Sequence, residues 1–151
     1  MSVQMHIISF GKMTTEYKAL YEHFRKMIRP QIIEHELLCR KPLDPDSLKV
    51  EEAIMAKKLL PKNAVLVALD PTGKELTSEK LSEFIEKMKD AGRSIVFVIG
   101  GAYGLDSKIK DDADLVLSLS KMTMPHLLAK LVLIEQIYRA QTISTGHPYH
   151  K

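Results

Sequence analysis

The stretch Ile99-Gly100-Gly101-Ala102-Tyr103-Gly104 decides the fold, because a glycine turn directly follows a run of apolar residues. That run, 94–99, and the earlier run 64–69 are continuous rather than alternating, a pattern typical of parallel strands covered on both faces. A third apolar run follows at 115–120. Ligands of parallel α/β sheets bind beyond the carboxyl ends of the strands. We therefore expect the functional site where these three runs end.

Amphipathic segments alternate with the apolar runs along the rest of the chain. The three-and-four spacing of apolar residues and the positions of proline, glycine and capping residues predict helices. The predicted helices span 15–28, 48–60, 77–91, 107–111 and about 123–143, and further strands span 5–10 and 32–38. Strands separated by helices pair in parallel through right-handed crossovers. The sequence therefore predicts an α/β fold with helices on both faces of a parallel sheet, in one domain over residues 1–151.

Composition narrows the class of protein. The chain has 151 residues, 45% of them hydrophobic, which is enough to fill the core of one domain. No stretch approaches the roughly 20 apolar residues of a membrane helix, and the sequence shows no secretory leader. The lone Cys39 is assigned to packing, since it has no partner for a disulfide. These features predict a cytoplasmic protein.

The net charge of +3 says little about partners, but the distribution of basic residues is more informative. Basic residues gather in and around the first predicted helix, and such a surface suits a phosphate backbone. They are Lys12, Lys18, Arg25, Lys26 and Arg29. An ordinary solvated helix face remains the alternative.

The strand ends carry several candidate ligand-binding groups. Gly100 and Gly101 allow a ligand to approach the backbone closely, although a tight turn without a ligand has the same sequence. The turn matches neither the dinucleotide fingerprint nor a phosphate loop. Asp70 either faces a ligand or starts a turn before proline. The segment 118–124 offers hydroxyls and methionines, of which Thr123 could instead cap the last helix and the methionines could fill the core.

Titratable groups gather late in the chain. His126 lies in the first turn of the last predicted helix, where the helix dipole favours a neutral imidazole. Arg139 lies four residues after Glu135, so the two can pair on one face of that helix. The tail 147–151 combines imidazole, phenol and ammonium groups that could stack on a base, although most chain ends do nothing. The six histidines show no metal-ligand spacing with acids or Cys39, so we expect no metal site.

Five motifs, taken together, resemble the bacterial RlmH family, a group of small SPOUT methyltransferases. The likeness spans nearly the whole chain, and the order and spacing of the motifs are specific. The motifs are Leu69-Asp70-x-x-Gly73-Lys74, Phe97-Val98-Ile99-Gly100-Gly101-x-x-Gly104-Leu105, Leu117-Ser118-Leu119-Ser120-x-Met122-Thr123-x-Pro125-His126, Glu135-Gln136-x-Tyr138-Arg139-Ala140 and His147-Pro148-Tyr149-His150.

The resemblance implies an enzyme that uses S-adenosylmethionine to methylate N3 of a pseudouridine in 23S ribosomal RNA, on the ribosome or its large subunit. It also implies a homodimer, a trefoil knot in the C-terminal half, and neither a metal nor a membrane partner. The cofactor would be held by Leu69, Gly100, Gly101, Leu119, Ser120, Lys121, Met122, Thr123 and Met124. His126, Arg139, Tyr149 and His150 would orient or deprotonate the base. The alternative is a non-catalytic α/β module that binds a nucleotide or metabolite.

Overall fold

The computed structural model describes residues 3–151, so Met1 and Ser2 of the predicted domain lie outside it. Five parallel strands form one sheet in the order β2-β1-β4-β3-β5. The strands are β1 (Met5–Phe10), β2 (Ile33–Leu37), β3 (Val65–Glu75), β4 (Ile95–Val98) and β5 (Leu115–Ser118). The helices are α1 (Thr15–Arg25), α2 (Pro45–Lys57), α3 (Ser78–Asp90), α4 (Ser107–Asp112) and α5 (His126–Thr145). The predicted parallel α/β class is confirmed.

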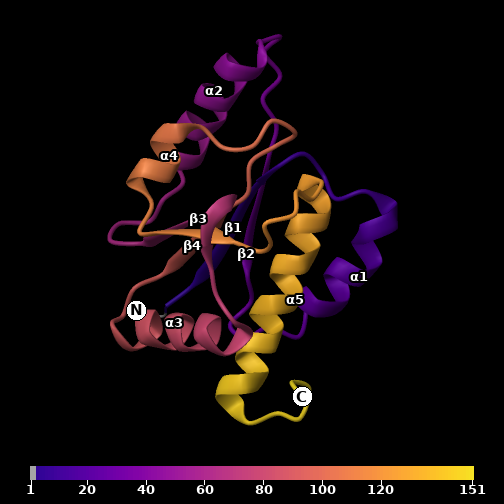
Figure 1. The fold of residues 1–151 in the computed structure, drawn as a ribbon, viewed down its shortest axis with the longest axis vertical. Helices are drawn as coiled ribbons and strands as arrows, with labels where there is room; N and C mark the ends of the chain where they lie inside the picture. Colours follow the sequence, from indigo (N-terminus) through magenta and orange to yellow (C-terminus); the bar gives the residue numbers. More distant parts are fainter. Residues whose placement is uncertain (1–2) are drawn as a thin grey trace.

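Helices cover both faces of the sheet, as Figure 1 shows. On one face, α1, α3 and α5 pack over the side chains of Ile7 and Phe97, both fully buried. On the other face, α2 and α4 contribute Ala56 and Ile109 to a second core that contains Val98. Since both faces are apolar, the central strands read as continuous hydrophobic runs.

Strand β3 differs from its prediction. The sequence predicts a strand that ends at Leu69 and a turn over 70–73, whereas the structure continues the strand to Glu75. Leu117 of β5 faces both Leu69 and Lys74, so the turn is an interruption inside the strand. Gly73 is required there, because a Cβ would lie 2.5 Å from the carbonyl oxygen of Val116. The predicted turn over 70–73 forms, but the chain pairs with β5 again after it.

Helices α1 and α2 also differ from prediction. Helix α2 begins at Pro45 instead of Leu48, because the Asp44 side chain accepts a hydrogen bond from the Ser47 amide at 2.8 Å and caps it. In α1, the spacing of apolar residues predicts that Leu20 and Tyr21 are both buried; Tyr21 is buried, but Leu20 is 49% exposed. Helix α1 ends at Arg25, and Ile28 is buried beyond its end.

Helix α5 begins at His126, and Pro125 is its N-cap residue. The expectation that Thr123 starts or caps this helix is wrong, and Pro125 lies just before the first turn, with an extended ψ of 144°. The helix runs to Thr145 and ends at Gly146, which adopts a left-handed φ of 73°. Over residues 3–151, no helix is both long enough and apolar enough to cross a bilayer.

Candidate active site

The carboxyl ends of β3, β4 and β5 surround a cavity of about 710 Å³, which the start of α5 also lines. Cavities of this size hold drug-sized ligands and cofactors. The lining comprises Leu69, Asp70, Pro71, Ile99, Gly100, Gly101, Ala102, Tyr103, Gly104, Leu117, Leu119, Ser120, Met122, Thr123, Met124, Pro125, His126 and Ala129. The cavity therefore lies where the sequence predicts a site, with a mainly apolar wall and exposed backbone.

The glycine turn after β4 forms one wall of this cavity. The Gly104 amide donates a hydrogen bond to the Gly101 carbonyl at 3.0 Å, which closes the turn. Gly100 packs so tightly on Gly104 that a Cβ at Gly100 would lie 2.5 Å from its backbone. Gly104 adopts φ +81°, a conformation that glycine takes without strain. The glycines are needed for the shape of the wall, whatever it binds.

The segment after β5 forms the opposite wall. The Ser118 hydroxyl donates to the Ser120 carbonyl at 3.0 Å, and the Met122 amide donates to the Ser120 hydroxyl oxygen at 3.0 Å. These serine hydroxyls thus shape the segment itself. Met122 is 79% exposed at the rim, so it does not fill the core.

Asp70 stabilises the third wall from within. Its carboxylate accepts the Thr72 amide at 2.8 Å and lies 3.1 Å from the Lys110 ammonium of α4. Burial acts to raise the pKa of Asp70, but the bonds from Thr72 and the charge of Lys110 prevail and lower it. Asp70 therefore starts the turn and ties it to α4, as its structural interpretation predicts.

His126 lines the cavity at the first residue of α5. A Cβ at Gly11, just after β1, would lie 3.9 Å from its Nε2 atom, so the β1 end passes close to the imidazole. One turn further along α5, the Lys130 ammonium is 1% exposed and lies 3.1 Å from Glu36 and 3.4 Å from Glu34 of β2. This buried cation ties the start of α5 to the edge strand and so fixes where His126 lies.

The predicted cofactor residues come together, with one exception. All of them line the cavity except Lys121, whose side chain is 84% exposed and 3.9 Å from Glu75. Sequence reasoning missed several lining residues, including Pro71, Tyr103 and Ala129. Pro71 and Tyr103 belong to the same strand-end turns, and Ala129 follows His126 by three residues on one helix face, so these positions could have been inferred.

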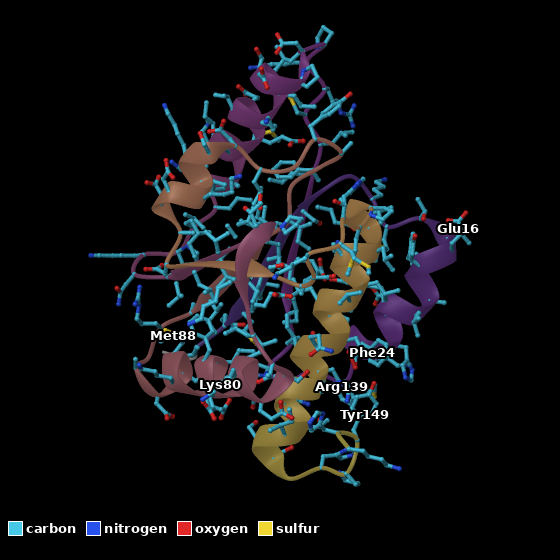
Figure 2. All side chains as sticks on the ribbon, viewed as in Figure 1. Glu16, Phe24, Lys80, Met88, Arg139 and Tyr149 are labelled. Atoms are coloured by element: carbon cyan, nitrogen blue, oxygen red, sulfur yellow. The ribbon has the colours of Figure 1, made fainter. Side chains whose placement is uncertain are left out.

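The predicted catalytic residues of the tail form a separate cluster around the C-terminal part of α5. Arg139 donates to Glu135 at 2.9 Å, and its guanidinium lies 4.8 Å from the Tyr149 ring centre. The Tyr149 hydroxyl donates to Glu135 at 3.1 Å. Figure 2 shows Arg139 and Tyr149 side by side near the end of the chain. The tail is therefore packed against α5.

The hydrogen bonds of His150 assign its tautomer. A guanidinium can only donate, so the contact of 3.1 Å between Arg139 and Nδ1 makes Nδ1 the acceptor. Nε2 then carries the proton and donates to Glu79 at 2.8 Å. Both ring nitrogens of His150 are therefore occupied by Arg139 and Glu79.

Neighbouring groups also hold Arg139 and Tyr149 in fixed protonation states. The hydrogen bond that Arg139 donates to Glu135 raises the pKa of Arg139. Burial raises the pKa of the Tyr149 phenol, and the Glu135 charge adds to this effect. The cluster thus presents a permanent cation and a neutral phenol.

Within one chain, the tail cluster and the cavity are far apart. His126 is the first residue of α5 and Arg139 lies 13 residues further along it, so the helical rise separates them by about 20 Å along the axis. Figure 1 shows the same separation: α5 starts beside the strand ends and runs past α1 and α3 before the chain ends. The structure therefore brings His126 to the cavity but not Arg139, Tyr149 or His150 of the same chain.

The predicted basic surface is only partly free. Arg25 pairs with Glu22 at 2.7 Å, and Arg29 donates to the carbonyl oxygen of Lys26 at 2.6 Å. Lys12 and Lys18 are exposed. In the described part of the chain, no three His, Cys, Asp or Glu side chains are grouped so as to hold a metal ion.

Comparison with known proteins agrees with this geometry. Residues 3–150 match a family described as "Predicted SPOUT methyltransferase". The "Ribosomal RNA large subunit methyltransferase H" of Paraburkholderia xenovorans is 36% identical over 156 residues, with 99% of each chain covered. The protein of the same name from Allorhizobium ampelinum is 52% identical over 104 residues, a match that spans 68% of this chain and 65% of that protein.

A solved structure shares the fold. The SpoU methyltransferase AviRb from Streptomyces viridochromogenes, solved in complex with AdoMet, superposes with a TM-score of 0.53 at 13% identity, covering 95% of this chain and 60% of that chain. At this identity the likeness concerns the fold alone. From the family match and the full-length relative, the chain belongs to the SPOUT methyltransferases and, within them, to the RlmH family.

Proposed function

We propose that this protein transfers a methyl group from S-adenosylmethionine to large-subunit ribosomal RNA, at N3 of a pseudouridine. The cavity beyond β3, β4 and β5 is the observation that carries the proposal, because it joins the three predicted cofactor segments in one place. The RlmH relatives support the RNA substrate.

The cavity suits an adenosyl group in size and chemistry. Its apolar walls, Leu69, Leu117 and Leu119 among them, would contact the purine. The glycine turn would offer backbone donors and acceptors to the polar edges of the ligand. The cofactor supplies an activated methyl group on a cationic sulfur and leaves as a neutral thioether. Since the ligand has no phosphate, the lack of a phosphate-binding loop is consistent with it.

The residues of the chain have two tasks in this reaction. They must hold the base nitrogen in line with the methyl group, a positioning effect worth up to about 7 to 11 kcal/mol. They must also remove the N3 proton, so that the nitrogen electron pair can form the new bond. His126 at the cavity is the nearest acceptor among the four proposed catalytic residues. The Arg139 cation would stabilise negative charge on a base carbonyl.

We propose that the tail cluster reaches the cavity from the second chain of a homodimer. The separation of about 20 Å along α5 rules out a meeting within one chain in this conformation. Helix α5 carries apolar residues on all sides, and Leu127, Leu128 and Val132 stay partly exposed, which favours a partner along this helix. The knot predicted from the resemblance, the cytoplasmic location and the ribosomal particle remain part of the proposal.

Single-turnover methylation of ribosomes that lack the modification tests the proposal. With radiolabelled cofactor, the protein should label the large-subunit RNA, and mapping should place the methyl group at N3 of a pseudouridine. His126→Ala and Arg139→Ala should each slow this turnover by at least about ten-fold. Binding of the cofactor without any transfer would identify a metabolite-binding module instead.

A further inference from the structure

Glu52 of α2 is a buried acid behind the glycine turn. It is 8% exposed. A Cβ at Gly101 would lie 3.1 Å from Oε2 and 3.5 Å from Oε1 of this carboxylate. Gly101 also lines the cavity. The carboxylate therefore packs on one of the residues that line the cavity.

The polar group next to the Glu52 carboxylate is the backbone amide of Gly101. The Gly101 backbone N–H interacts with the carboxylate and favours its charged form. Burial raises the pKa of Glu52, and this interaction with Gly101 opposes the rise without cancelling it. Across residues 3–151, no basic side chain lies within ion-pair distance of Glu52. Burying an acid without a neighbouring cation costs stability. We therefore expect the contact between Glu52 and Gly101 to serve a function that offsets this cost.

The glycine turn is a flexible part of the backbone that a contact with Glu52 can stabilise. Gly100 and Gly101 have no side chains to pack against the core, and glycine is the residue with the most backbone freedom. The bond between Gly104 and Gly101 closes the turn, and the Glu52 carboxylate packs against Gly101 from the side of α2. A turn held in its bound shape loses less entropy when the ligand arrives.

We propose that Glu52 is a positioning residue: its carboxylate holds the Gly101 amide and thereby fixes the glycine turn in the shape that receives the cofactor. This role rests on the proposed function, because it concerns the same cavity. Glu52 acts through Gly101 and takes no part in the transfer step itself.

Hydrogen exchange in the cofactor-free protein tests the anchor directly. Glu52→Ala should expose the Gly101 amide and speed its exchange by at least about ten-fold, while amides in β4 stay protected. Glu52→Gln keeps an acceptor oxygen but loses the charge, so exchange should rise by a smaller factor, about three-fold. The neighbouring Glu51→Ala removes only the ion pair with Lys41, 3.2 Å long, and should leave Gly101 unchanged. Unchanged exchange in both Glu52 variants would overturn the anchor.

Calorimetry with S-adenosylmethionine then tests the consequence. Glu52→Ala should bind it about ten-fold more weakly, with the KM for the cofactor raised and kcat at saturation kept within about two-fold. Faster exchange at Gly101 without weaker binding would overturn the positioning role. If Glu52→Ala does not fold, Glu52→Gln decides the matter by the same two measurements. If the wild-type protein binds no cofactor, the proposed function fails, while the exchange result still judges the anchor.

Discussion

Some glycines in the cavity wall leave no space for a larger side chain, and a substitution can test this. A Cβ at Gly100 would meet the Gly104 backbone at 2.5 Å, so Gly100→Ala must open the turn. We expect cofactor affinity to fall at least about ten-fold and stability to fall by about 1 to 3 kcal/mol, measured by calorimetry and thermal unfolding. Gly92→Ala is the control: Gly92 ends α3 with φ +71° and no neighbour within 4 Å, so this variant should lose stability but keep its affinity.

The buried Lys130 is a second residue with a measurable role. Lys130→Ala leaves Glu34 and Glu36 facing each other without their shared cation. Because the side chains of Glu34 and Glu36 are 22% and 37% exposed, we expect a loss of about 2 kcal/mol, below the roughly 3 to 5 of a fully buried pair. Chemical denaturation measures it. A loss no larger than that of Lys80→Ala, which removes an exposed pair with Glu83, would contradict this role.

At the scale of elements, the turn that interrupts β3 is stabilised by the negative charge of Asp70. The pKa of Asp70 is lowered in the folded protein, so its carboxylate contributes stability above its unfolded pKa. That contribution is lost as the pH falls through the lower, folded pKa. Asn at this position keeps the turn but not the ion pair with Lys110. Denaturation between about pH 5 and pH 2 should therefore show a smaller decline in Asp70→Asn than in the wild-type protein. Parallel pH profiles would contradict this assignment.

The tail is an element whose function can be separated from the cavity. Removal of residues 148–151 leaves every lining residue of the cavity in place. We expect the truncated protein to bind S-adenosylmethionine within about three-fold of the wild-type affinity, but to lose nearly all methyl transfer. Calorimetry and the ribosome assay give the two readouts. Equal loss of both would show that the tail supports the cavity rather than the reaction.

At the scale of the whole molecule, the distance between His126 and Arg139 along α5 leads to a prediction about mixed dimers. In a homodimer with the tail of one chain at the cavity of the other, an Arg139→Ala chain and a Gly100→Ala chain complement each other. Mixing equal amounts after co-refolding should restore about a quarter of wild-type activity, since half of the dimers are mixed and each has one intact site. Activity no higher than the sum of the separate variants would place each site within one chain.

The sequence by itself determined the strands and the walls of the cavity, because both leave local signals. Continuous apolar runs mark buried parallel strands, and the glycine turn and the 118–124 segment follow them directly. The specific roles came from family motifs rather than from periodicity. Apart from Lys121, the predicted cofactor residues therefore lie together.

Only the tertiary structure decided which distant segments pack behind the cavity walls and where the tail lies. Glu52 meets Gly101 from another helix, and β3 resumes pairing after its turn, neither of which leaves a periodic trace. The tail packs on Glu135 and Glu79 and contacts Arg139, which lies about 20 Å along α5 from His126. Sequence patterns report which side chains are buried and how the local backbone bends, whereas the meeting of distant segments depends on how whole elements pack.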